Sequence, residues 1–121
     1  MFMTTVFFRF DPKQKRMFYT GCGHEHILVY RADEGVTEVI TTGGIALAMA
    51  DDIEKIVEEK EIKLKANDVD VLYSDGITEA INDKQELFGL ERLTACVSKY
   101  GHLGDSLKIF EAISKDVTTF V

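Results

Sequence analysis

The most reactive-looking segment of the sequence is Asp75-Gly76, which follows a mostly apolar stretch from Val69 to Tyr73. A carboxylate at the end of a strand is held by a rigid backbone and still faces solvent. Hard divalent cations such as Mg²⁺ and Mn²⁺ prefer oxygen ligands of this kind. We expect Gly76 to let the backbone turn directly after the strand. Because Asp-Gly is also a common turn sequence, the pair alone leaves both a metal ligand and a plain turn open.

Two other groups of residues have types that could bind a metal or react. His24 and His26 flank Glu25, and a His-x-His segment on a strand places both imidazoles on one face, where they could bind a metal. Cys22 and Cys96 lie far apart and have no Cys-x-x-Cys spacing, so neither a zinc site nor a redox pair is indicated. We expect both thiols to be buried apolar groups in a reducing compartment.

The first part of the chain has the pattern of β-strands. Stretches rich in β-branched and aromatic residues alternate with turn residues such as Asp, Pro and Gly. This pattern predicts one hairpin with strands at 4–10 and 17–22, and a second hairpin with strands at 27–31 and 36–40.

The middle of the chain begins with a glycine-containing stretch over 41–52, which we expect to be flexible. Alternating charged and apolar residues favour a strand over about 57–65, although apolar residues at helical spacing also allow a helix over 51–60. A turn at 66–68 then leads to a strand over 69–73. Because that strand is mostly apolar, we expect it to be central in its sheet.

Helical spacing dominates the last third. Residues 78–82 can start a helical turn, and 90–100 has the pattern of an amphipathic helix that Gly101 ends. Asp105 or Ser106 is expected to cap a final helix. Strands followed by helices in a chain of 121 residues indicate one α+β domain spanning 1–121. The buried stripe predicted for the final helix is Leu107, Phe110, Ile113 and Val117.

Composition excludes some classes of function. The net charge is -7, from 14 basic and 21 acidic side chains. This balance disfavours binding to nucleic acids or anionic membranes, which attract clustered positive charge. No apolar run approaches the roughly 20 residues of a membrane span, and the N-terminus lacks the basic region of a signal peptide. We therefore expect a cytoplasmic protein.

Several short motifs occur together in a fixed order. Their order and spacing resemble those of the SpoIIE/RsbU branch of the bacterial PPM-type (protein phosphatase 2C-like) serine/threonine phosphatases. The resemblance covers about residues 1 to 120 and is most specific in the Asp-Gly-x-Thr-Glu-Ala and Phe-Gly-x-x-Arg-Leu elements. The motifs are Asp11-Pro12, Gly21-Cys22-Gly23-His24, Thr42-Gly43-Gly44, Tyr73 to Ala80, and Leu87 to Leu93.

The resemblance implies a fold and a chemistry. The family fold is an antiparallel β-sandwich with flanking helices, and its active site holds two Mn²⁺ or Mg²⁺ ions among acidic residues. A metal-bound water attacks the phosphorus of phosphoserine or phosphothreonine, so no cysteine nucleophile is required. Asp75 matches a metal-ligating aspartate of the family, and Gly76 matches the residue that follows it. The same resemblance favours a structural role for His24 and leaves the role of His26 open.

The sequence also departs from the family pattern. A family domain begins with a segment that supplies further metal ligands and ends with an Asp-Asp-x-Thr strand. Neither is found in these 121 residues. We therefore expect a partial domain, incomplete at both ends, whose isolated chain binds metal weakly and is inactive. Missing strands would leave open sheet edges, so we expect a homodimer or a strand-swapped oligomer.

Two functions of different classes remain open at this stage. The first is a fragment of a metal-dependent protein phosphatase, whose substrate the resemblance implies to be a phosphorylated anti-anti-sigma-type regulatory protein. The alternative is a non-catalytic, phosphatase-like module that binds proteins in bacterial signalling. The two differ in whether upstream and downstream sequence of the parent gene carries the missing metal-ligating aspartates.

Overall fold

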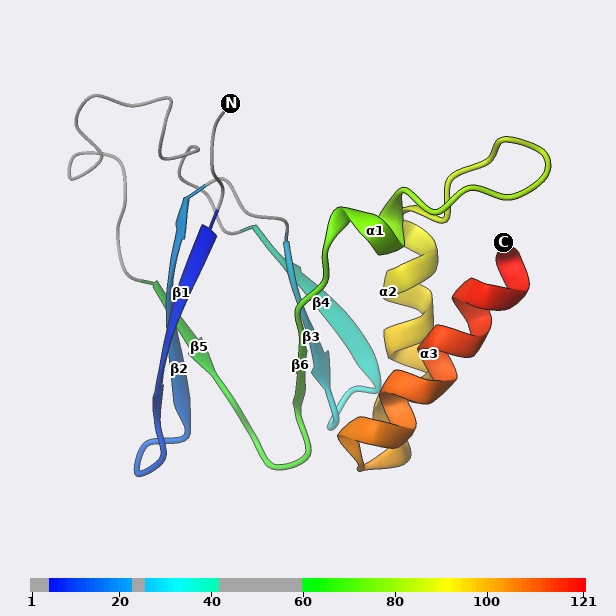
Figure 1. The fold of residues 1–121 in the computed structure, drawn as a ribbon. Coiled ribbons are helices and arrows are strands. Elements are labelled where there is room, and N and C mark those ends of the chain that lie inside the picture. Colours follow the sequence, from blue (N-terminus) through cyan, green and yellow to red (C-terminus); the bar gives the residue numbers. More distant parts are fainter. Residues whose placement is uncertain (1–4, 23–25, 42–59) are drawn as a thin grey trace, which may run out of the picture. The chain divides into compact units, whose positions relative to one another are not determined.

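The protein is an α+β chain made of two compact units (Figure 1). The first unit comprises residues 1–26 and 41–65, and the second comprises 27–40 and 66–121. Each contains one antiparallel sheet of three described strands. In the described part of the chain, no helix is long and apolar enough to cross a membrane. The computed structural model describes residues 5–22, 26–41 and 60–121.

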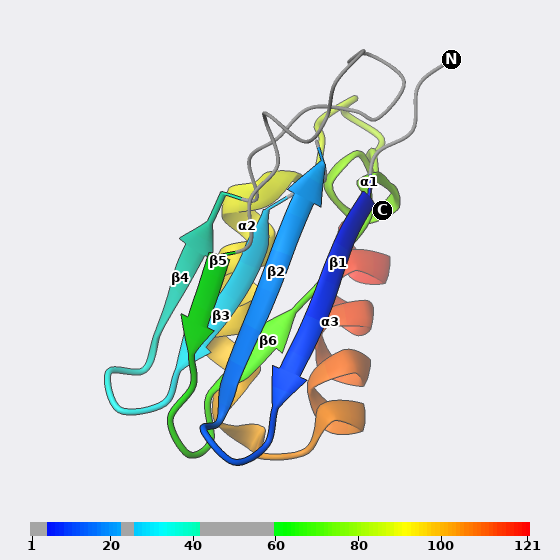
Figure 2. The same cartoon turned by 90° about the vertical axis from the view of Figure 1, so that its left-hand side faces the viewer.

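The sheet of the first unit has the strand order β1-β2-β5. Strands β1 (Thr5–Asp11) and β2 (Arg16–Cys22) lie side by side as an antiparallel hairpin (Figure 2). A carboxylate oxygen of Asp11 accepts hydrogen bonds from the backbone N–H groups two and three residues later, at 3.0 and 3.2 Å, which holds the turn. Strand β5 (Lys60–Lys63) pairs with the other edge of β2. The hairpin predicted over 4–22 is confirmed.

The sheet of the second unit has the order β4-β3-β6. Strands β3 (Ile27–Arg31) and β4 (Val36–Ile40) form the second predicted hairpin, and β6 (Val69–Val71) pairs with the other edge of β3. The expectation that 69–73 is the central strand is wrong among the described strands. The central strand is β3, which is almost completely buried, whereas β6 lies at the edge and is only partly buried.

The helices of the second unit cover one face of its sheet (Figure 1). They are α1 (Asp75–Thr78), α2 (Gly89–Tyr100) and α3 (Ser106–Phe120), with a short 3-10 helix η3 (Gly101–Leu103) after α2. The predicted helical turn at 78–82 is therefore misplaced, because α1 ends at Thr78. The core beneath these helices consists of Leu28, Tyr30, Tyr73, Phe88, Leu93, Cys96 and Val97.

The predicted end of the helix is confirmed, because α2 ends at Tyr100 and Gly101 is its C-cap residue. The φ of Gly101 is −58°, within the right-handed helical region, and the chain continues into η3. The left-handed residue that ends this helical segment is Gly104, with φ 72°. A Cβ atom at Gly101 would overlap the ring of the buried Tyr30. Glycine is required at this position because β3 and the end of α2 approach each other closely.

Asp105 caps the start of α3. It is one of the two residues, Asp105 and Ser106, that were predicted as the cap. One carboxylate oxygen of Asp105 accepts hydrogen bonds from the backbone N–H groups of Leu107 and Lys108 at 2.8 and 3.4 Å. The predicted buried stripe of this helix is only half correct. Ile113 and Val117 pack against the core and Ile109 is buried, but Leu107 and Phe110 are 61% and 66% exposed.

We expect Asp105→Ala to lower the free energy of unfolding by about 1 kcal/mol, because two N–H groups at the helix start lose their acceptor. Urea denaturation of the variant measures this loss. The matched control is Ser106→Ala at the next position, which removes a hydroxyl but not the cap. Equal effects of both substitutions would show that the cap does not stabilise α3.

Some predictions fall outside the described residues. They are the flexible stretch beyond Thr41, the helix alternative before Lys60 and the positions of His24 and Glu25. The side chain of Cys22 is also outside the described part of the chain.

Candidate functional site

Asp75 lies where the chain leaves the sheet of the second unit and enters α1. The preceding residue, Ser74, is extended, with φ −117° and ψ 169°, and acts as the N-cap position of the helix. The backbone N–H of Ile77 donates to the carbonyl of Ser74 at 3.1 Å, and that of Glu79 donates to the carbonyl of Asp75 at 2.8 Å. These bonds fix the backbone around an exposed Asp75 carboxylate. Strand β6 ends at Val71, so Asp75 lies a short segment beyond the strand, and its role as a metal ligand stays a prediction.

Gly76 does not have the conformation that the sequence suggested. It is the second residue of α1, and its φ lies outside the left-handed region. A Cβ atom there would lie 3.5 Å from the Oγ atom of Ser74, an ordinary contact. The turn after the strand therefore does not depend on glycine, and the part that Gly76 plays in a metal site stays a prediction.

The described residues do not assemble a metal site around Asp75. Within this part of the chain, no group of three or more His, Cys, Asp or Glu side chains is arranged to hold an ion. His26 has a buried Nδ1 atom that makes no hydrogen bond to any described residue. Asp75 thus fits one ligand position, and these residues alone do not fit a two-ion centre.

The one cysteine whose side chain is described does not resemble a nucleophile. Cys96 is a buried, free thiol whose Sγ atom lies 3.5 Å from Oδ2 of Asp116. Burial, with the nearby Asp116 carboxylate, raises the pKa of Cys96 to about 11. The same carboxylate accepts hydrogen bonds from the hydroxyl of Tyr100 at 2.9 and 3.0 Å. The prediction that Cys96 is buried is confirmed.

An ion-pair network lies next to the start of β6. The guanidinium of Arg31 donates to Oδ2 of Asp68 at 3.1 Å and to Oε2 of Glu38 at 2.9 Å. The side chain of Asp68 is only 1% exposed, and its Oδ1 atom also accepts the backbone N–H of Ala32 at 2.9 Å. These bonds satisfy the buried carboxylate and join β3, β4 and the segment before β6.

Asp70, in the middle of β6, has no comparable partner. Its Oδ1 atom is buried and makes no hydrogen bond to the described residues. Burial raises the pKa of Asp70 to about 6, and the Asp68 carboxylate adds to the shift while Arg31 opposes it. Asp70 was not predicted from the sequence as a site residue, because it stands inside a predicted, mostly apolar strand. The sequence feature that could have identified Asp70 is the presence of a charged residue between the apolar residues Val69 and Val71.

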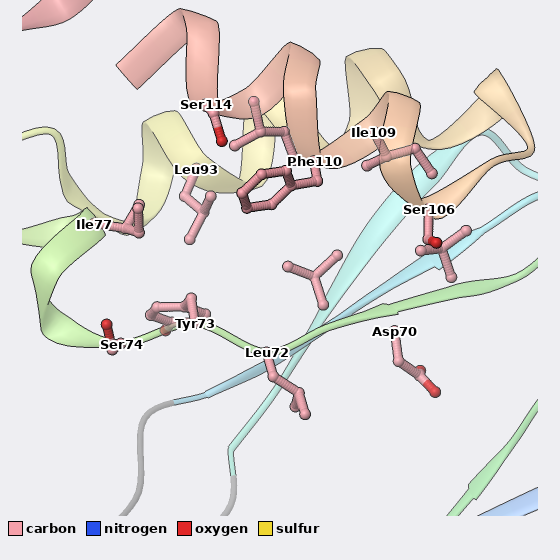
Figure 3. Close-up of a pocket in the computed structure, with 13 residues that line it drawn as sticks. Asp70, Leu72, Tyr73, Ser74, Ile77, Leu93, Ser106, Ile109, Phe110 and Ser114 are labelled. Atoms are coloured by element: carbon pink, nitrogen blue, oxygen red, sulfur yellow. The ribbon is translucent and has the colours of Figure 1, made fainter. Parts of the chain in front are cut away.

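A groove of about 390 Å³ lies between the β6–Ser74 segment and α3 (Figure 3). Val69, Val71 and Ile109 form part of its apolar lining, and Ser74, next to Asp75, lies at one end. Figure 3 shows Asp70 at the margin, with its carboxylate directed away from Ile109 and Phe110. The groove was not predicted from the sequence, because Phe110 was expected to lie in the core.

Comparison with known proteins gives one curated relative of limited similarity. Protein IcfG of Synechocystis sp. (strain ATCC 27184 / PCC 6803 / Kazusa) is 27% identical over 93 residues, which cover 77% of this chain and 14% of that protein. The chain therefore spans about one seventh of the length of this relative.

A solved structure and a protein-family model both match almost the whole chain. The structure is the phosphatase domain of the cell fate determinant SpoIIE from Bacillus subtilis, presoaked with Mn. It has a TM-score of 0.67 and 16% identity, and the match covers 97% of this chain and 49% of that one. The two antiparallel sheets and the helices thus have the fold of that domain, as predicted. The model of the family described as Stage II sporulation protein E (SpoIIE) matches residues 1–120. The chain belongs to the SpoIIE family.

Proposed function

We propose that this chain is part of a metal-dependent phosphatase that hydrolyses phosphoserine or phosphothreonine in proteins. The observation that supports this proposal is the position of Asp75, an exposed carboxylate on the first residue of α1. Membership in the SpoIIE family supports the type of reaction. In this proposal Asp75 supplies one ligand of a site for Mn²⁺ or Mg²⁺, and segments outside the described residues supply the others.

The finer parts of the proposal come from the family resemblance. The substrate is a phosphorylated regulatory protein of the anti-anti-sigma type, and the reaction takes place in the cytoplasm. The isolated chain is inactive, because a single carboxylate does not hold two ions.

Metal binding by the chain tests the role of Asp75. We expect calorimetry to show Mn²⁺ binding weaker than about 10⁻⁴ M, and we expect Asp75→Ala to abolish it. The matched control is Asp83→Ala, which removes another exposed carboxylate from the loop after α1. Retained binding in Asp75→Ala, or tight binding of two ions by the chain, would contradict the assignment.

The activity is tested on the full-length gene product with a phosphoserine protein and Mn²⁺. Turnover that requires both the metal and Asp75 supports a phosphatase. If the gene product has no turnover but retains a protein partner, the non-catalytic binding module is the better description.

A further inference from the structure

Each described sheet has two edges with no described partner strand, those of β1 and β5 in one sheet and those of β4 and β6 in the other. Strand β1 pairs only with β2, and β6 pairs only with β3. The N–H and C=O groups along such an edge can pair with an added strand. The side chains on such an edge therefore decide which strand it accepts.

The β6 edge has an apolar side and an acidic side. Val69 and Val71 pack against the helical core, and both line the groove beneath α3. Asp70 points to the opposite side, since side chains alternate along a strand. Its buried Oδ1 atom makes no hydrogen bond to the described residues. A strand added here would need apolar side chains on the groove side and a donor facing Asp70.

The β1 edge carries the complementary pattern. Phe8 and Phe10 are 36% and 57% exposed and lie on the same side of the strand. Arg9 lies between them on the opposite side, with its guanidinium carbon 4.0 Å from the centre of the Phe18 ring. An apolar-basic-apolar sequence on one open edge thus matches an apolar-acidic-apolar sequence on the other.

We propose that β1 of one copy of this chain adds to β6 of a second copy as an antiparallel strand. Pairing Arg9 with Asp70 in this orientation places Phe8 opposite Val71 and Phe10 opposite Val69. Both phenyl rings then lie on the groove side, and the guanidinium of Arg9 lies on the same side as the Asp70 carboxylate, whose Oδ1 atom makes no hydrogen bond to the described residues. Cross-strand pairs of opposite charge and of apolar residues stabilise such a ladder. The proposal does not depend on the proposed phosphatase activity.

Charge disfavours the symmetric alternatives. Two copies of β6 paired about Asp70 would place two carboxylates directly opposite each other, and two copies of β1 would do the same with two guanidinium groups. Like charges directly opposite destabilise a strand pair. The pairing of β1 with β6 brings opposite charges together and keeps the apolar sides of both strands on the same face.

Sedimentation velocity over a range of concentrations tests the proposal. We expect wild type to self-associate, and we expect Arg9→Glu and Asp70→Lys each to raise its dissociation constant about tenfold. An equimolar mixture of the two variants should associate as well as wild type, because both contacts between them then join opposite charges. Lys13→Glu makes the same change of charge in the exposed β1–β2 turn and should have no effect.

Circular dichroism confirms that the variants fold, and amide exchange gives a second readout. The amides of residues 69–71 should exchange more slowly at high concentration in wild type but not in either single variant. The proposal is wrong if wild type is a monomer throughout, or if the mixture associates no better than its components. It is also wrong if only the Asp70 variant changes association, since that result indicates pairing of β6 with itself.

Discussion

Gly101→Ala is expected to lower the free energy of unfolding by about 2–3 kcal/mol. An added Cβ atom would overlap the base of the Tyr30 ring, where even the Cδ2 atom is 2.6 Å away. Tyr30 is 5% exposed and belongs to the core beneath α2, so the ring cannot turn out into solvent. The strain must be relieved by moving the end of α2 away from β3. Urea denaturation followed by circular dichroism measures the loss.

Gly76→Ala is the matched control for this prediction. Gly76 also has a φ outside the left-handed region, and a Cβ atom there has room. Because alanine favours helix over glycine, we expect this variant to be as stable as wild type or up to about 1 kcal/mol more stable. A Gly101→Ala variant that is as stable as Gly76→Ala would show that the close approach to Tyr30 is not required for folding.

The strands could be predicted from sequence because local chemistry specifies them. Asp11 holds the first turn through its carboxylate, and Gly35 and Asn67 take the left-handed conformation in the later turns. Strand order could not be predicted in the same way. Both β3 and the 69–73 segment are mostly apolar, and which of them has neighbours on both sides depends on pairing between distant segments.

The buried side of α3 was the largest error in the helical part. Apolar residues fit two overlapping stripes of this helix, one through Leu107 and Phe110 and the other through Ile109 and Phe120. Only the second stripe meets the core, and this depends on how α3 packs beside α2. The groove beside β6 was missed for the same reason.

The position of Asp75 could be predicted, because an apolar strand followed by Asp-Gly is a local pattern. The residues around it could not. Asp70 was counted within an apolar strand, and its burial without a hydrogen-bond partner became visible only in the folded sheet. A sequence shows that a charged residue is present in a strand, but the free-energy cost of burying that charge depends on which neighbours surround it in the folded protein.

Asp70→Asn is expected to stabilise the isolated chain at neutral pH. Burial raises the pKa of Asp70 from 3.8 to about 6. The Asp70 carboxylate therefore binds a proton more tightly in the folded state than in the unfolded state. The contribution of this group to stability is therefore complete below pH 3.8 and is lost as the pH rises through about 6. The whole shift corresponds to about 3 kcal/mol. Because part of the group remains accessible to solvent, we expect Asp70→Asn to gain about 1–2 kcal/mol above pH 6.

The gain should disappear on acidification, because wild-type Asp70 is then neutral as well. Urea denaturation of wild type and variant at matched pH values, at concentrations where the chain is monomeric, measures the difference. Asp68→Asn is the control from the same segment. The Asp68 carboxylate is ion-paired with Arg31 and accepts the backbone N–H of Ala32. The same substitution there should therefore lower the free energy of unfolding by more than about 1 kcal/mol. If both variants lose stability at neutral pH, Asp70 has a partner in the folded chain. If the Asp70→Asn variant is more stable than wild type as a monomer and yet associates less well, that result would show that the Asp70 carboxylate lowers the stability of the monomer and stabilises the contact between copies.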